Sequence, residues 1–130
     1  MGSVFIDNLK TIRYRMTAAA KRTNRDGDAI TLVAVTKYAP LSAVKEALLS
    51  GLIGEVGENR VQDAERKKLA LGELAARVRW RLIGHLQTNK AKKAVSVFDA
   101  VDSIDDEKVA AALDAAFGAR SALSGSNRRL

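Results

Sequence analysis

Of the 130 residues, 47% are hydrophobic, which is enough for the core of one soluble domain, and no apolar run approaches the roughly 20 residues that span a bilayer. The chain has no cysteine and one histidine, which excludes disulfides and cysteine nucleophiles and argues against a structural zinc site. Because the N-terminus does not resemble a signal peptide, these properties predict a cytoplasmic protein without a membrane partner.

The formal net charge is +7, and the basic side chains are concentrated in residues 1–25 and in the C-terminal stretch. A basic surface can attract phosphates or nucleic acid. The chain has few aromatic side chains for base stacking, however, and carries no recognised nucleic-acid motif. We therefore interpret the charge as a solvated helix face and expect no nucleic-acid partner.

Apolar residues recur at every third or fourth position from Phe5 to Ala20, which predicts an amphipathic helix. The run Ile30–Val35 is entirely apolar or β-branched and is bounded by turn residues, so it predicts a strand buried on both faces. Three more strand–helix units are expected after it. The further strands are Leu52–Val56, Val78–Ile83 and Ala100–Ile104. The helix after the first strand is expected to begin after Pro40, with Ser42 as its N-cap. The next three helices are expected to begin near Arg60, near Ala91 and after Asp105-Asp106-Glu107.

Strictly alternating strand–helix units of this length are typical of a parallel α/β sheet covered by helices. We therefore expect one α/β unit over residues 1–119. Residues 120–130 are polar and basic without a strand signal, and they are expected to form a disordered tail.

Lys37 comes directly after the first predicted strand. In parallel sheets and barrels covered by helices, ligands bind at the carboxyl ends of the strands. A lysine is a poor choice for the end of a buried strand unless its amine has a function or a path to water. The position of Lys37 therefore indicates a candidate site.

Polar blocks follow all four predicted strands. They are Val35-Thr36-Lys37, Gly57-Glu58-Asn59-Arg60-Val61-Gln62, Ile83-Gly84-His85-Leu86-Gln87-Thr88-Asn89-Lys90 and Asp102-Ser103-Ile104-Asp105. In this combination they resemble the YggS/PROSC family of pyridoxal phosphate homeostasis proteins, and the resemblance runs from about residue 5 to residue 117.

The resemblance implies a TIM-type barrel like the barrel domain of alanine racemases, with pyridoxal 5′-phosphate held as a Schiff base on Lys37. It places Asn59 in the cofactor pocket, and His85 and Ser103 at strand ends near the cofactor. Members of the family are regarded as cofactor carriers or buffers, so the resemblance implies a homeostasis role without catalytic residues. The residue types suit this role, because an imine-forming lysine can reach its neutral form and an amide can orient the ring.

Each of these residues also has a purely structural interpretation. Lys37 can extend from a loop into water, and Asn59 can cap the following helix. His85 can be a hydrogen-bonded core histidine, and Ser103 can be a turn or capping residue. The sequence leaves these alternatives open.

A complete barrel of this type has eight strands and takes about 250 residues, whereas four strands are predicted here. We expect the chain to correspond to the N-terminal half of a family member, without the phosphate-binding loops that follow the last two strands. The open edges of a half barrel favour pairing with other strands, so self-association is expected. The alternative function is a truncated fragment without a cofactor role that interacts through its basic surface.

Overall fold

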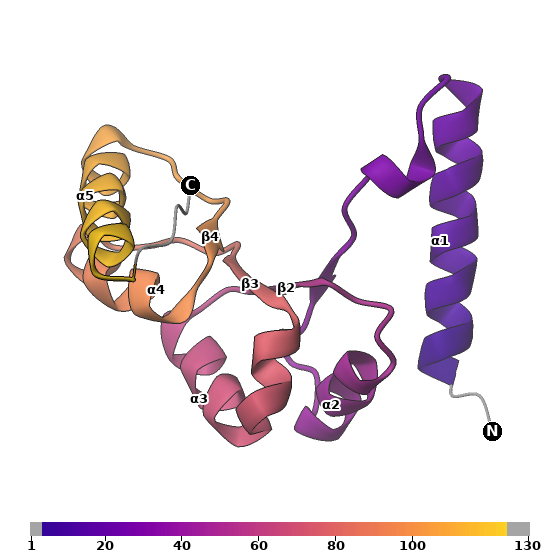
Figure 1. The fold of residues 1–130 in the computed structure, drawn as a ribbon, viewed down its shortest axis with the longest axis horizontal. Coiled ribbons are helices and arrows are strands. Elements are labelled where there is room, and N and C mark those ends of the chain that lie inside the picture. The colour runs from indigo at the N-terminus through magenta and orange to yellow at the C-terminus, as the bar shows by residue number, and fades with distance from the viewer. Residues whose placement is uncertain (1–3, 125–130) are drawn as a thin grey trace.

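The computed structural model describes residues 4–124, with the side chains described through residue 120. Helices and strands alternate along the chain after an N-terminal helix (Figure 1). The helices are α1 (Val4–Arg22), α2 (Leu41–Leu49), α3 (Val61–Leu71), α4 (Ala91–Val97) and α5 (Glu107–Ser124). The strands are β1 (Val33–Val35), β2 (Glu55–Glu58), β3 (Arg79–Leu82) and β4 (Ala100–Val101), and short 3-10 helices are η1 (Gly27–Ala29), η2 (Gly72–Arg77) and η3 (Thr88–Lys90).

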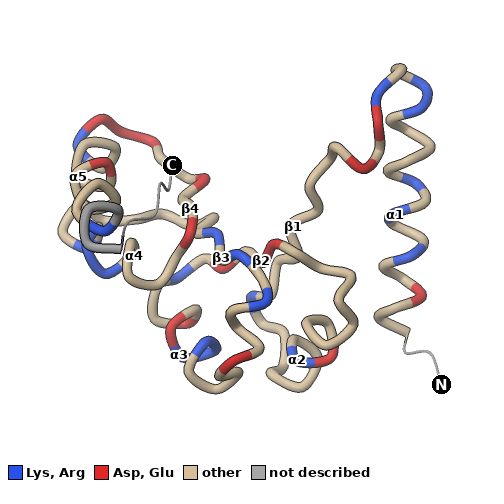
Figure 2. Tube along the Cα trace, viewed as in Figure 1, with Lys and Arg blue, Asp and Glu red and all other residues tan. Residues whose placement is uncertain are grey.

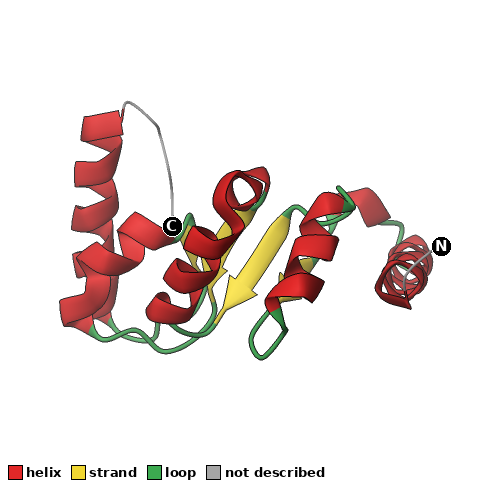
Figure 3. Cartoon of the chain, turned by 90° about the horizontal axis from the view of Figure 1, so that it is seen from below, coloured by secondary structure: helices red, strands yellow, loops and turns green. Residues whose placement is uncertain are grey.

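The four strands form one parallel sheet in the order β1-β2-β3-β4. Val35 is paired with Gly57, and Gly57 is paired in turn with Arg81, so neighbouring strands end at nearly the same level. Helices α2, α3 and α4 lie along one side of the sheet (Figures 1 and 3). The predicted parallel α/β arrangement is therefore confirmed.

The side of the sheet that faces the helices forms the core. Val56, Trp80 and Leu82 point into it and are at most 1% exposed. The Trp80 indole Nε1 also donates a hydrogen bond of 2.9 Å to the carbonyl of Ala75, which satisfies its one polar group. Helix residues complete the same cluster, among them Leu48, Val95 and Leu113.

The opposite side of the sheet is not covered by any helix within residues 4–124 (Figure 1). On that side a Cβ at Gly57 would meet Val33 at 3.1 Å and Ile83 at 3.2 Å, so these residues share one face. Val35, two positions beyond Val33, is 49% exposed. The prediction that β1 is buried on both faces is therefore wrong, because an apolar run does not reveal whether a second layer covers it.

Charged residues link three strands across this open face. The Arg81 guanidinium donates to Asp102 at 2.8 and 2.7 Å and to Glu55 Oε1 at 2.8 Å. The hydrogen bond to Asp102 is the main cause that raises the pKa of Arg81 above its ordinary value, with Glu55 adding to it and burial opposing it. The second oxygen of Glu55 is buried and has no hydrogen-bond partner among the described residues.

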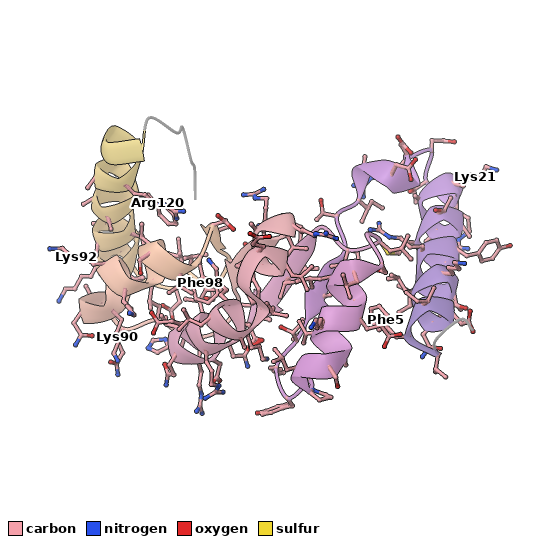
Figure 4. All side chains as sticks on the ribbon, turned by 60° about the horizontal axis from the view of Figure 1, so that its bottom comes forward. Phe5, Lys21, Lys90, Lys92, Phe98 and Arg120 are labelled. Atoms are coloured by element: carbon pink, nitrogen blue, oxygen red, sulfur yellow. The ribbon has the colours of Figure 1, made fainter. Side chains whose placement is uncertain are left out.

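The amphipathic helix predicted near the N-terminus is confirmed as α1, which stands to one side of the sheet (Figure 1). Leu9 is buried, and Phe5 packs against the core on the side of α1 that faces α2 (Figure 4). Basic residues are distributed along the helix (Figure 2), and Lys21 points away from the rest of the molecule (Figure 4). None of the helices in residues 4–124 has the length and apolar character needed to cross a membrane.

Some element boundaries differ from the sequence prediction. Ser42 is not an N-cap: α2 begins at Leu41, and Pro40 occupies the N-cap position with φ −65°. The fixed ring of proline already holds the backbone angle that precedes a helix, so the helix starts one residue after it. At the other end of the chain, α5 continues through Ser124, so the expected boundary at residue 119 falls inside this helix. Residues 125–130, the last part of the expected tail, lie outside the described residues.

Helix α4 ends in carbonyl groups that receive hydrogen bonds from two other helices. Arg120 of α5 donates to the carbonyls of Val95 at 2.6 Å and Phe98 at 3.0 Å, and Lys68 of α3 donates to Val97 at 2.7 Å. Figure 4 shows Arg120 on the side of α5 that faces the body of the molecule. These side chains satisfy the orphan carbonyls of the helix end and tie α3, α4 and α5 together.

We predict that Arg120→Met lowers the free energy of unfolding by about 1.5–3 kcal/mol, because at least one charge-assisted hydrogen bond to a helix carbonyl is lost. Denaturant unfolding followed by circular dichroism measures the change. Lys45→Met, at an exposed position in α2, is the matched control and should stay within about 0.5 kcal/mol of the parent chain. Equal effects of the two substitutions would contradict a capping role for Arg120.

Candidate functional site

Lys37 lies in the turn between β1 and α2, at the carboxyl end of the first strand. Its side chain is exposed, and its Nζ is 5.8 Å from the centre of the Tyr38 ring. Tyr38 has a φ of +63°, which reverses the chain immediately after the lysine. The turn places Lys37 on the wall of a cavity of about 340 Å³.

This cavity opens between the β1–α2 turn and the start of α3. Lys37 and Asn59 both contribute to it, as do residues that precede and line α3. Its wall consists of Lys37, Tyr38, Ala39, Glu58, Asn59, Arg60, Asp63, Arg66 and Lys67.

A buried ion pair lies next to the backbone that carries Lys37. Glu58 is 1% exposed, and Lys67 of α3 donates to its two carboxylate oxygens at 2.8 and 2.9 Å. The same ammonium group donates to the carbonyl of Thr36 at 2.6 Å, and the Thr36 hydroxyl donates to Glu58 at 2.6 Å. The residue directly before Lys37 is therefore held by a strand and a helix at once.

The polar groups of Thr36 and Glu58 are hydrogen-bonded to their neighbours on β2 and α3. The Thr36 amide donates to the carbonyl of Gly57 at 3.1 Å, which continues the β1–β2 pairing to the last residue before the turn. The Glu58 carboxylate accepts from both Thr36 and Lys67. Burying a carboxylate is costly unless it is paired and hydrogen-bonded, and both conditions are met.

Asn59, Gly84 and Ser103 are connected through the backbone at the ends of β2, β3 and β4. A Cβ at Gly84 would lie 2.1 Å from the carbonyl oxygen of Asn59, so only glycine allows the two backbones to approach this closely. The Ser103 hydroxyl donates to the carbonyl of Gly84. Asn59 itself does not cap α3, because Arg60 is the N-cap residue and no side chain caps that end.

His85 lies at the rim rather than in the core. Its side chain is 70% exposed, and Nδ1 is 3.6 Å from the carboxylate of Asp105. The alternative of a buried core histidine is therefore wrong. Within residues 4–124, no group of three or more histidine, aspartate or glutamate side chains is placed to hold a metal ion.

The four residues singled out from the sequence thus fall into two sets. Lys37 and Asn59 line the same cavity, whereas His85 and Ser103 do not line it. Glu58 and Lys67 also line this cavity but are not among the residues predicted from the sequence. One signal was present: a carboxylate at a predicted strand end requires a partner if it is buried.

With this geometry in view, comparisons with known proteins give a consistent result. The chain is 38% identical over 108 residues to the pyridoxal phosphate homeostasis protein of Escherichia coli K12, a match that covers 82% of this chain and 46% of the relative. The protein of the same name from Pseudomonas aeruginosa is 35% identical over 83% of this chain and 46% of its own length.

The chain is a relative of the pyridoxal phosphate homeostasis proteins. The resemblance predicted from the strand-end blocks is therefore confirmed. The chain spans about half the length of the curated relatives it matches. A comparison with models of protein families finds no match.

Solved structures agree with this relationship. PipY of Synechococcus elongatus, determined with PLP bound, superposes with a TM-score of 0.64 at 40% identity, over 70% of this chain and 42% of PipY. The structure of PipY without PLP gives a TM-score of 0.67 at 37% identity over 82% of this chain and 48% of PipY. The helix and strand arrangement described above is therefore shared with PipY.

We predict that Glu58→Gln and Lys67→Met each lower the free energy of unfolding by about 3–5 kcal/mol, because each leaves one buried charge without its partner. The double variant Glu58→Gln/Lys67→Met should lose less than the sum of the two, which a double-mutant cycle from denaturant unfolding measures. The pair Asp63–Arg66 is the control, since Arg66 is 74% exposed and Asp63→Asn should cost at most about 1 kcal/mol. Additive losses at Glu58 and Lys67 would contradict a coupled buried pair.

Proposed function

We propose that this chain binds pyridoxal 5′-phosphate in an intracellular homeostasis role and holds it as a Schiff base on Lys37. The observation that carries the proposal is that Lys37 and Asn59, at the ends of two adjacent parallel strands, line one cavity of about 340 Å³. Two findings from relatives support it: the names of the homeostasis proteins, and the PipY structure with PLP bound.

The residues present fit such a ligand. An exposed primary amine beside a cavity can react with an aldehyde once it has lost its proton, and the reaction releases water. The bound group would supply the reactive aldehyde and a conjugated ring. The neutral amide of Asn59 would orient the ring through hydrogen bonds, and the arrangement of Thr36, Glu58 and Lys67 would keep the Lys37 backbone in place.

In this proposal His85 and Ser103 contribute from outside the cavity. The Ser103 hydroxyl is engaged by the carbonyl of Gly84, so its proposed part is to fix the Gly84 backbone against Asn59. His85, paired with Asp105 at the rim, would meet the ligand at its open side. Both assignments follow the family resemblance.

We further propose that the chain acts without catalysis and that its four strand–helix units are part of a TIM-type barrel. The relatives' names indicate homeostasis rather than turnover. Two acid–base groups of the cavity wall, Glu58 and Lys67, are already engaged with each other. A racemase or transaminase would need a further base in this place.

We predict that borohydride reduction of the chain with pyridoxal phosphate, followed by peptide mapping, labels Lys37 above all other lysines. The physical reason is that Lys37 combines an exposed amine with the wall of the cavity that Asn59 also lines. Lys37→Ala should abolish the visible absorbance of the complex at ligand concentrations that saturate the parent chain.

Lys45→Ala is the control, because Lys45 is exposed on α2 and lies outside the cavity. Label spread evenly over Lys37, Lys45 and Lys90 would indicate ordinary surface imines. That outcome would favour the alternative function, a fragment that interacts through its basic surface without a cofactor role.

We also propose that the chain associates with itself through the open side of its sheet. Two observations favour this: Val35 is 49% exposed at the edge strand β1, and a buried oxygen of Glu55 on the same face has no partner among the described residues. Unpaired parallel edges and an uncovered apolar residue both favour pairing with another chain.

We therefore predict a concentration-dependent increase in sedimentation coefficient for the parent chain. Val35→Asp should shift the distribution toward the monomer, because a carboxylate on this face would be desolvated by the contact. Leu69→Asp is the matched control, since Leu69 is 80% exposed on α3 and away from the sheet edges. A monomer at every concentration tested would exclude this association.

A further inference from the structure

The cavity beside Lys37 has more positive than negative groups in its wall. Lysine and arginine contribute four charged side chains, Lys37, Arg60, Arg66 and Lys67, against the two carboxylates Glu58 and Asp63. The net charge of the wall is therefore +2 when all six groups are ionised. An excess of cations around a concave site attracts anions.

Both carboxylates are already neutralised within the wall. Glu58 is paired with Lys67 at 2.8 Å, and Asp63 is paired with Arg66 at 2.9 Å. The two cations left over are Lys37 and Arg60, whose side chains form no hydrogen bond or ion pair with any residue in the described part of the chain. The positive surplus is therefore located at these two side chains rather than spread over the cavity.

The residues left over come from two adjacent strand ends. Lys37 follows β1, and Arg60 lies between β2 and α3 as the N-cap residue of α3. A guanidinium carries only donors and cannot cap the N–H groups of this helix end, and no side chain caps them. The planar guanidinium of arginine matches the oxygens of a phosphate group with two parallel hydrogen bonds, while a lysine acts as a point charge.

We propose that Arg60, together with the neighbouring basic side chains of this cavity, forms a subsite for a dianionic phosphate monoester. A volume of about 340 Å³ accommodates a phosphate group together with a small organic part. Two kinds of ligand could supply the phosphate group in this subsite. One is an aldehyde bound to Lys37 that carries its own phosphate, and the other is a separate phosphate ion or monoester. Only the first source rests on the proposed function, because the second needs no bond to Lys37.

The first experiment tests the subsite without any aldehyde. Inorganic phosphate is titrated into the full chain at constant ionic strength, and backbone amide shifts of Tyr38, Asn59 and Arg60 are followed by NMR. We expect saturable shifts confined to the cavity wall. Arg60→Gln should raise the phosphate dissociation constant at least about tenfold, the loss expected for one charge-assisted hydrogen bond. The dissociation constant of Arg60→Lys should lie between those of the parent chain and Arg60→Gln.

Arg15→Gln is the matched control, because it removes one positive charge from an exposed position on α1. It should leave the phosphate dissociation constant within about twofold of the parent value. Arg60 is exposed and makes no contacts that the fold depends on, so its variants should keep the amide spectrum of the rest of the chain. Absence of saturable shifts, or equal effects of Arg60→Gln and Arg15→Gln, would overturn the proposal.

A second experiment separates the two sources. Formation of the Lys37 adduct is compared for pyridoxal phosphate and for pyridoxal, with chloride or inorganic phosphate as the buffer anion. A preference for the phosphorylated aldehyde that disappears in Arg60→Gln identifies the ligand's own phosphate. Equal affinities, with inorganic phosphate still saturating the parent chain, identify a separate anion. A failure of Lys37 to react with either aldehyde would count against the proposed function alone, since the titration does not depend on it.

Discussion

The buried pairing of Glu58 with Lys67 is the interaction on which the geometry of the site depends. It joins the end of β2 to α3 and, through the carbonyl and hydroxyl of Thr36, to the end of β1. A charged pair that is removed from water stabilises only when its remaining hydrogen-bonding capacity is used, and Thr36 supplies that capacity here. The consequence is that the residue before Lys37 cannot move independently of the second strand and the third helix.

The period of two along a strand places this support on the side of the sheet that carries the helices, next to the cavity, whose wall includes Glu58 and Lys67. Thr36 and Glu58 point toward the helices, where Lys67 reaches them, while the following residues Lys37 and Asn59 begin the turns that line the cavity. One residue of slip between β1 and β2 would turn either Thr36 or Glu58 to the other face and break the hydrogen bond between them. The observed pairing of Val35 with Gly57 is therefore as important for the site as the identity of the lysine.

Local features of the sequence were sufficient for the strand–helix order and for the placement of Lys37 and Asn59, because the carboxyl ends of adjacent parallel strands lie together. The Glu58–Lys67 pair could not be predicted in the same way, since its partners are separated by a turn and by two turns of helix. The burial of β1 was overestimated, because a continuous apolar run carries no information on whether a second layer exists. Ser42 is not a cap because Pro40 already fixes the helix start.

Apolar and charged residues occupy different strands on the open face of the sheet. At β1 the face is apolar and Val35 remains half exposed, whereas Arg81 of β3 donates hydrogen bonds to Glu55 of β2 and to Asp102 after β4. Such mutual pairing makes that part of the face compatible with water, because each exposed charge keeps a partner of opposite sign. The remaining oxygen of Glu55 is buried without a donor in residues 4–124. Polar and apolar groups are therefore distributed unevenly over the open face. A second layer packed against this face would stabilise the fold most at the β1 edge and the centre of the sheet, and least at β4.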